Sequence, residues 1–381
     1  MKLNMKLLII LMMFPQFVET IYSPALPSIA IAFNVPENQA QWTISIYFIA
    51  FAIGVVFWGI QSDYIGRRKA MIYGLITYCI ASIIALFSSF FPLILLTRII
   101  AAFGISVGSV ITQTIMRDVY TGKDLNKVFS IMGVALSISP IIGLLAGGTL
   151  IKYYSYYGVF LFLAILSFLL ATITIFTLPE TKQNHIPIGL KQIKEVAKQL
   201  YTDPSIGLFA LLIMGFNVML FSYYSFAPFI FKKVNLDTTM YGYSGIILAI
   251  GTFIGSSINK YYIQKNKSPY TLIMGACLLS LGSAIGIYFT QHSLYFLLPT
   301  LLSVAAFGIA IPNVLSQALI HYKHQIGTAG ALFGLLYYLL IGLGLLISNE
   351  LSNIGIVYLL FSSLVVVLSY FLYQKNKAIN S

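Results

Sequence analysis

Apolar stretches long enough to cross a lipid bilayer recur along almost the whole of this 381-residue chain. A membrane-spanning helix needs about 20 mainly apolar residues. Only 8% of the residues are charged and 59% are hydrophobic, whereas soluble domains carry about 25% charged residues. The sequence therefore predicts an all-α membrane protein with twelve transmembrane helices. The apolar runs fall near residues 7–33, 40–60, 70–90, 92–115, 127–151, 158–178, 205–230, 241–262, 269–290, 295–320, 327–348 and 353–373.

The longest polar stretch divides these predicted spans into two sets of six. It carries acidic and basic residues, among them Glu180, Lys182 and Lys191. We predict an N-terminal six-helix bundle over residues 1–178, a cytoplasmic linker over 179–204 and a C-terminal six-helix bundle over 205–381. The spacing of charges over residues 190–200 also predicts a short surface helix within the linker.

Lysine and arginine are unevenly distributed between alternate loops. With the N-terminus inside the cell, most of the 22 Lys and Arg residues fall on the cytoplasmic side. Positive charge concentrates on that side of membrane proteins, so both termini are predicted to be cytoplasmic. The same bias explains the net charge of +12 without a nucleic-acid partner, because basic loops lie beside anionic lipid.

One short loop carries a dense pattern of charges and glycines. Residues 59–69 read GIQSDYIGRRK and join the second and third predicted spans. Gly59 and Gly66 permit tight turns and close helix approach. Asp63 can accept hydrogen bonds from Arg67 or lie beside a positive helix N-terminus. A loop that only orients the chain in the membrane is the simpler interpretation of these residues.

The spacing in this loop resembles the signature G-x-x-x-D-x-x-G-R-R/K of the major facilitator superfamily, which occurs at the same place between spans 2 and 3. The resemblance implies the major facilitator fold of two six-helix bundles. It also implies that the loop controls conformational gating through charge contacts. The gating residues are then Gly59, Asp63, Gly66, Arg67 and Arg68.

Further stretches resemble more specific motifs of that family. Residues 95–108, LLTRIIAAFGISVG, are similar to its span-4 motif, with Arg98 as the motif's arginine. Residues 133–148, GVALSISPIIGLLAGG, resemble the span-5 motif of drug:proton antiporters. The residues that carry this antiporter-like motif are Pro140, Gly143 and Gly147.

Three other stretches narrow the resemblance to one subfamily. YSPALPSIA (22–30), SVITQTIMRDVY (109–120) and LPET (178–181) look most like the Bcr/CflA-type multidrug efflux proteins. One departure follows span 5, where the subfamily has a W-x-x-W-R-like stretch and this chain reads YYSYYGVF (153–160).

Two charges lie well inside predicted spans, Glu19 in the first and Arg98 in the fourth. A charge at such a position costs at least ~2.5–3.5 kcal/mol on insertion scales. At about 1.5 Å per residue the two side chains fall at a similar depth. The resemblance implies that spans 1 and 4 both line a central cavity. Glu19 and Arg98 are therefore expected to be neighbours there, directly or through water or Gln113.

This expected pair suggests how transport is coupled to protons. A low-dielectric site favours the neutral form of a carboxyl group, and a nearby cation favours its ionised form. Glu19 is expected to take up and release the coupling proton, with Arg98 as its partner. Two other interpretations fit the same residues: a structural pair that fixes helix packing, and recognition of cationic substrates without proton coupling.

Several polar and aromatic side chains are candidates for the wall of the substrate cavity. They lie in spans 1, 4, 7 and 10, which line the cavity in the family. Each of the polar side chains also fits the ordinary role of an interhelical hydrogen bond. The candidates are Gln16, Tyr22, Gln113, Asn217, Tyr223, Asn313 and Gln317.

Together these features predict a proton-coupled secondary active exporter of small molecules that works by alternating access. A dedicated exporter of an endogenous metabolite such as a siderophore is the main alternative, and a proton-coupled importer is a weaker one. The sequence has no nucleotide-binding G-x-x-x-x-G-K-[ST] loop, so the proton gradient is the expected energy source, without a cofactor.

No cluster of catalytic groups or metal ligands occurs, so neither an enzyme nor a metal site is predicted. The expected partners are the small-molecule substrate, protons and the lipid bilayer. A monomer in a bacterial inner membrane is expected, the location being implied by the subfamily resemblance.

Overall fold

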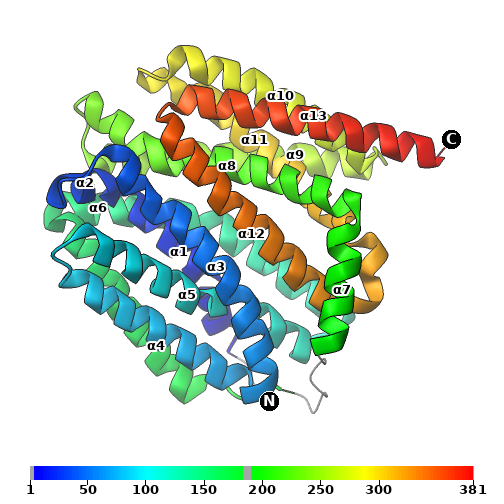
Figure 1. The fold of residues 1–381 in the computed structure, drawn as a ribbon, viewed down its shortest axis with the longest axis horizontal. Coiled ribbons are helices and arrows are strands. Elements are labelled where there is room, and N and C mark those ends of the chain that lie inside the picture. The colour runs from blue at the N-terminus through cyan, green and yellow to red at the C-terminus, as the bar shows by residue number, and fades with distance from the viewer. Residues whose placement is uncertain (1–3, 183–189, 381) are drawn as a thin grey trace. The chain divides into compact units, whose positions relative to one another are not determined.

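The computed structural model describes residues 4–182 and 190–380, and every regular element in these ranges is helical (Figure 1). The chain forms two compact units, Met1–Gly189 and Leu190–Ser381. The first unit contains α1 (Met5–Tyr22), a 3₁₀ turn (Ser23–Ala25), α2 (Leu26–Ala32), α3 (Glu37–Ile65), α4 (Arg67–Leu86), α5 (Phe91–Val119) and α6 (Gly122–Thr177). The second contains α7 (Leu190–Thr202), α8 (Pro204–Lys233), α9 (Thr238–Gln264), α10 (Pro269–Thr290), a 3₁₀ turn (Leu294–Phe296), α11 (Leu297–Ala318), a second 3₁₀ turn (Ile320–Gln325), α12 (Ile326–Leu351) and α13 (Ile354–Asn380).

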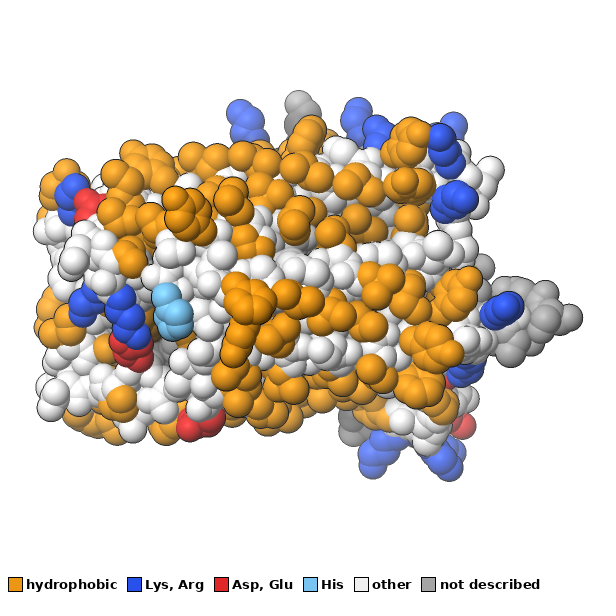
Figure 2. Space-filling model, turned by 90° about the horizontal axis from the view of Figure 1, so that it is seen from above, with side chains coloured by type: hydrophobic (Ala, Val, Ile, Leu, Met, Phe, Trp, Pro, Cys, Tyr) orange, Lys and Arg blue, Asp and Glu red, His pale blue; other side chains and the backbone are white. Residues whose placement is uncertain are grey.

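The outer surfaces of these helices suit a lipid environment. Within the described ranges, 11 helices are long and apolar enough to cross a membrane. Large apolar side chains point outward from them; Phe253 and Phe176, for example, are 74% and 82% exposed. Figure 2 shows a surface covered mainly by hydrophobic side chains, with few charged ones among them. The predicted all-α, multi-pass membrane protein is therefore confirmed.

The number of candidate spans differs from the predicted twelve at one helix, α6. Its 56 residues include both runs that the sequence separated, 127–151 and 158–178. A straight helix of that length would reach about 84 Å, far beyond a hydrocarbon core of ~30 Å. The backbone leaves the helical conformation at Ser155, with φ 56° and ψ −166°, between the two runs. The break at Ser155 therefore falls between the two predicted runs and divides α6 into two helical segments.

Glycines allow the helices to approach closely within each unit. A Cβ atom added to Gly54 on α3 would lie 2.7 Å from the Phe103 oxygen on α5. In the second unit, a Cβ atom on Gly255 of α9 would lie 2.1 Å from the Ala305 oxygen on α11. Small residues drive helix association in membranes because they let backbones meet. The two units therefore repeat the same type of close crossing between corresponding helices.

The predicted surface helix in the linker is present as α7 and is confirmed. One face of α7 is apolar and packed, with Val196 and Leu200 buried. The Tyr201 hydroxyl donates a hydrogen bond to the Leu332 oxygen on α12 at 3.0 Å. Helix α7 is thus held against the second unit rather than lying free in solvent.

Acidic residues outside the spans serve as helix caps. Asp203 accepts from the Ser205 backbone nitrogen at 2.8 Å, at the start of α8. Asp237 accepts from the Met240 nitrogen at 2.9 Å, at the start of α9. Each carboxylate satisfies a backbone donor that the first helical turn leaves open. These two acids therefore have structural roles at helix ends.

Candidate functional site

Arg98 lies deep inside the first unit, between two tyrosine rings. Its side chain projects from α5 and is 2% exposed. The guanidinium carbon lies 3.9 Å from the centroid of the Tyr22 ring on α1 and 4.5 Å from that of Tyr47 on α3. A desolvated cation over an aromatic face gains about 2 kcal/mol or more. The two rings therefore offset part of the cost of burying this charge.

Most of the hydrogen-bonding capacity of Arg98 is unused in the part of the chain that the structure describes. Its Nε donates to the Thr43 backbone oxygen at 3.5 Å, a long contact. The two terminal nitrogens have no described hydrogen bond. The buried hydroxyl of Tyr47 also has no hydrogen-bond partner there. Buried polar groups are normally paired, so these groups are unusual in having unused hydrogen-bonding capacity.

Glu19 is half-buried on α1, and its carboxylate also lacks a described partner. It forms no ion pair with Arg98 within 4.0 Å among the described residues, although each side chain lies within range of the other's charge. Gln113 does not bridge them in the described part of the chain, because its side-chain amide donates instead to the Ser109 hydroxyl at 3.5 Å. The structure thus brings Glu19 and Arg98 into one region without pairing them.

The antiporter-like motif on α6 holds the backbone of α1 next to Glu19. A Cβ atom on Gly143 would lie 2.0 Å from the Thr20 Oγ1, and one on Gly147 would lie 2.3 Å from the Ile21 oxygen. The hydroxyl of Ser139, just before Pro140, donates to the Met13 oxygen at 3.2 Å. The small residues of this motif therefore fix the position of the helix that carries the carboxylate.

The candidates in the second unit are satisfied by protein partners. Tyr223 and Ser244 share a hydrogen bond through their hydroxyls. Asn313 donates to Asn259 on α9 at 2.7 Å and to the Ile309 oxygen of its own helix. Asn217 donates to the Ile213 oxygen at 2.8 Å. Gln317 contacts only the neighbouring Ser316 hydroxyl, at 3.3 Å, among the described residues. For Tyr223 and Asn313 the geometry favours the interhelical role.

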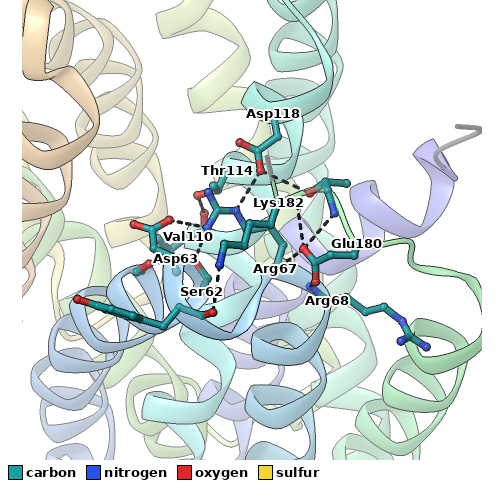
Figure 3. A network of polar contacts seen from close by, with 12 residues as sticks. Ser62, Asp63, Arg67, Arg68, Val110, Thr114, Asp118, Glu180 and Lys182 are labelled. Atoms are coloured by element: carbon teal, nitrogen blue, oxygen red, sulfur yellow. Dashed lines mark hydrogen bonds and ion pairs between the residues drawn. The ribbon is translucent and has the colours of Figure 1, made fainter. Parts of the chain in front are cut away.

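The predicted gating loop is the centre of a second polar cluster (Figure 3). Arg67 begins α4 and is buried. Its guanidinium forms ion pairs with Asp63, at the end of α3, and with Asp118, at the end of α5, the second at 3.0 Å. Hydrogen bonds between charged groups are stronger than neutral ones, so the two contacts stabilise the guanidinium in this position. The sequence indicated Asp63 and Arg67, whereas it did not indicate Asp118.

Glu180 caps α4 from a position more than 100 residues further along the chain. Its carboxylate accepts from the backbone nitrogens of Arg67 at 2.8 Å and Arg68 at 3.2 Å. An anion is stabilised there by the open backbone donors and the helix dipole. Gly66 has φ +95°, and a Cβ atom on it would lie 2.3 Å from Glu180. The positive φ and this close approach explain why glycine is needed at position 66. Gly59 has neither constraint.

Basic side chains satisfy the opposite ends of neighbouring helices. Lys182 Nζ donates to the Tyr64 oxygen at 3.1 Å, at the end of α3. The Arg68 guanidinium donates to the Ile175 oxygen at 2.6 Å, at the end of α6. Cations are favoured at helix C-termini, where carbonyls are left open. The loop after α3 and the segment after α6 therefore form one charge-matched network.

These features define a class of protein: a multi-pass helical membrane protein built from two units, with charged groups inside one unit and a charged network at its helix ends. The family model of the Major Facilitator Superfamily matches residues 8–345. The chain belongs to the Major Facilitator Superfamily, and it is a transporter rather than an enzyme.

Relatives and solved structures agree with this assignment. An uncharacterized transporter of Rickettsia bellii (strain RML369-C) is 32% identical over 363 residues, covering 90% of each chain. Multidrug resistance protein D of Escherichia coli (strain K12) is 25% identical over 334 residues, covering 86% of this chain and 84% of that one. The crystal structure of a D-xylose-proton symporter has a TM-score of 0.77 at 16% identity, covers 96% of each chain and supports the fold. The predicted resemblance to multidrug efflux proteins is confirmed at the level of sequence similarity.

Proposed function

We propose that this transporter is a proton-coupled exporter of small molecules in a bacterial inner membrane. One observation carries the proposal: Glu19 is a half-buried carboxylate inside a membrane-spanning helix and has no described protein partner. Acids in membrane spans are rare, and they mark proton relays and ion pathways by default. The export direction is supported by relatives named as multidrug resistance proteins.

In the proposed mechanism, Glu19 exchanges a proton for substrate. A proton bound from outside neutralises the carboxylate and is released inside, when the site opens to the cytoplasm. Substrate then binds to the ionised form and is carried outward. Alternating access of this kind is general for transporters built from two helical repeats. Arg98 sets the balance between the two forms of Glu19, because its charge favours the ionised carboxylate.

The test begins by finding the compound that the transporter moves. Small molecules inside and outside the cells of a wild-type and a deletion strain are compared, alongside a panel of dyes and antibiotics. Transport of the compound that the deletion strain retains is then measured in everted membrane vesicles with an imposed pH gradient. We expect the gradient-driven flux of Glu19→Gln to be at least about tenfold lower than that of the wild type, since the neutral amide cannot bind a proton.

A matched variant separates coupling from damage to the fold. Asp124→Asn removes an exposed acid from the first turn of α6, away from the membrane site. This variant is expected to keep the flux of the wild type. Full gradient-driven transport by Glu19→Gln would rule out the proposed role of the carboxylate.

A further inference from the structure

The first unit contains two opposite charges that the described protein leaves without a counter-charge in contact. Arg98 is buried, and its terminal nitrogens make no described hydrogen bond. Glu19 has no described hydrogen bond or ion pair, yet lies within range of the Arg98 charge. A buried charge without hydrogen bonds is costly, and pairing the two directly would remove much of that cost. A ligand that contacts both groups would satisfy the two charges that the protein leaves apart.

The hydroxyl of Tyr47 is a second, independent sign of a missing polar partner. Tyr47 is fully buried on α3, its ring faces Arg98, and its hydroxyl has no hydrogen-bond partner in the described chain. A carboxylate suits this place, because the planar guanidinium fork binds carboxylates in a bidentate manner. The hydroxyl would add one more donor to the same group. This arrangement points to a carboxylate on the ligand.

The expected coupling decides what else the ligand carries. The charge of a plain anion would favour the protonated form of Glu19, so anion and proton would bind together and move in the same direction. A ligand ammonium group would instead contact the ionised Glu19 and compete with the proton. Only this second arrangement gives exchange of substrate for proton. Tyr22 on α1, Tyr47 on α3 and Tyr78 on α4 are the other titratable groups that interact electrostatically with this cluster.

We propose that the substrate of this site is a small zwitterion of the α-amino acid type, with its carboxylate on Arg98 and Tyr47 and its ammonium on Glu19. The inference rests on the proposed function and adds the substrate class to it. The Tyr22 ring also lies against the guanidinium, with its centroid 3.9 Å from the guanidinium carbon, and helps to hold it in place.

Binding to the purified full-length protein in detergent tests the charge requirement. The twenty protein amino acids are screened by thermal shift, since a ligand of the folded state raises Tm with concentration. The best binder is then compared by calorimetry with its amide, which keeps only the ammonium, and with its N-acetyl form, which keeps only the carboxylate. We expect each derivative to bind at least about tenfold more weakly, as expected for a lost hydrogen-bonded charge. Equal binding of either derivative, or no binding by any amino acid, would overturn the proposal.

Substitutions assign the carboxylate to its subsite. Tyr47→Phe keeps the ring beside Arg98 and removes only the hydroxyl, so we expect about tenfold weaker binding of the amino acid. The amide should be affected by less than about twofold, because it offers no carboxylate to this hydroxyl. Arg98→Lys should weaken the amino acid further, since lysine lacks the planar fork. Tyr153→Phe, at a residue 70% exposed on α6, is the control and should change neither affinity.

Transport in proteoliposomes separates this inference from the proposed function. Amino-acid binding with the stated charge requirement, but without pH-gradient-driven flux, would support the zwitterion site and contradict the exporter. Gradient-driven efflux of a dye that no amino acid inhibits would support the exporter and contradict the zwitterion site.

Discussion

Single residues in this protein are constrained mainly by what lies against them. Gly66 shows this clearly, because it combines a positive φ of +95° with the Glu180 carboxylate at the place of a Cβ atom. Gly122 also has a positive φ, of +54°, but nothing lies within 4 Å of its missing Cβ atom. Comparing Gly66 with Gly122 therefore separates the effect of backbone strain from that of steric conflict.

We predict that Gly66→Ala destabilises the protein more than Gly122→Ala. Gly122→Ala should cost about 1 kcal/mol, the usual price of a non-glycine residue at positive φ. Gly66→Ala must also displace Glu180 from the start of α4 and should cost roughly 1–2 kcal/mol more. Thermal unfolding in detergent measures both. Equal losses in the two variants would show that Glu180 moves away without cost.

Asn313 offers a second residue-scale prediction. Its hydrogen bond to Asn259 joins α9 to α11. Asn313→Ala should therefore lower stability by about 0.6–2 kcal/mol, the range for interhelical hydrogen bonds in membranes. Substrate affinity should stay the same. A double-mutant cycle with Asn259→Ala measures the coupling energy between the two side chains. A loss of substrate affinity without a loss of stability would instead support Asn313 as a residue of the cavity wall.

Sequence reasoning found residues with unusual chemistry but not their long-range partners. Glu19 and Arg98 stand out because charges are rare in apolar runs, and Asp63 and Arg67 because their spacing matches a motif. Thr43, whose backbone oxygen accepts a hydrogen bond from Arg98, carries no such signal, since threonine is common in spans. Glu180 lies more than 100 residues from the helix that it caps, and no local pattern predicts that contact.

At the scale of elements, the ends of α3, α4, α5 and α6 are joined by matched charges. The acid Glu180 lies at a helix N-terminus, whereas Lys182 and Arg68 lie at C-termini. Each contact satisfies backbone groups that a helix end leaves open. The segment after α6 therefore contributes to the stability of the loop that the family resemblance links to gating.

We predict that Glu180→Ala lowers the stability of the first unit by about 0.5–2 kcal/mol, the usual cost of a lost cap. Glu180→Gln keeps an acceptor but loses the favourable charge, so about 0.3–1 kcal/mol should be lost. Hydrogen exchange at the start of α4 should rise in the same order. Unchanged exchange in Glu180→Ala would contradict the capping role.

The sequence predicted where α6 breaks, because the non-helical Ser155 lies between the predicted runs 127–151 and 158–178. The break is confined to that one residue and forms no polar loop. The intervening residues are largely aromatic, including Tyr153, Tyr154, Tyr156 and Tyr157. Such a stretch lacks the glycine and proline signals that end a helix.

The whole molecule is asymmetric in its chemistry although its units repeat a scheme. Each unit has a buried tyrosine on its first long helix, Tyr22 and Tyr223, and a glycine crossing, at Gly54 and Gly255. Among the described residues, Glu19 and Arg98, which both lie in the middle of spans, belong to the first unit. In the second unit, the hydroxyl of Tyr223 is hydrogen-bonded to that of Ser244. The proposed coupling chemistry therefore belongs to the first unit alone.

The distribution of lysine and arginine predicts the orientation of the whole chain. A fluorescent protein that folds only in the cytoplasm should fluoresce when fused after residue 381, because positive charge is retained inside. A phosphatase that is active only outside the cytoplasm should be inactive at the same position. Phosphatase activity there would place the C-terminus outside and reverse the proposed directions of proton and substrate movement.

Proton release on substrate binding tests the central claim most directly. The purified transporter is held in weakly buffered detergent solution at a pH where Glu19 is protonated, and the substrate is added while a pH indicator is read. We predict that the wild type releases about one proton per bound substrate, because substrate and proton compete for the carboxylate. Glu19→Gln should release none. Equal proton release by Glu19→Gln would contradict the claim that Glu19 exchanges a proton for substrate.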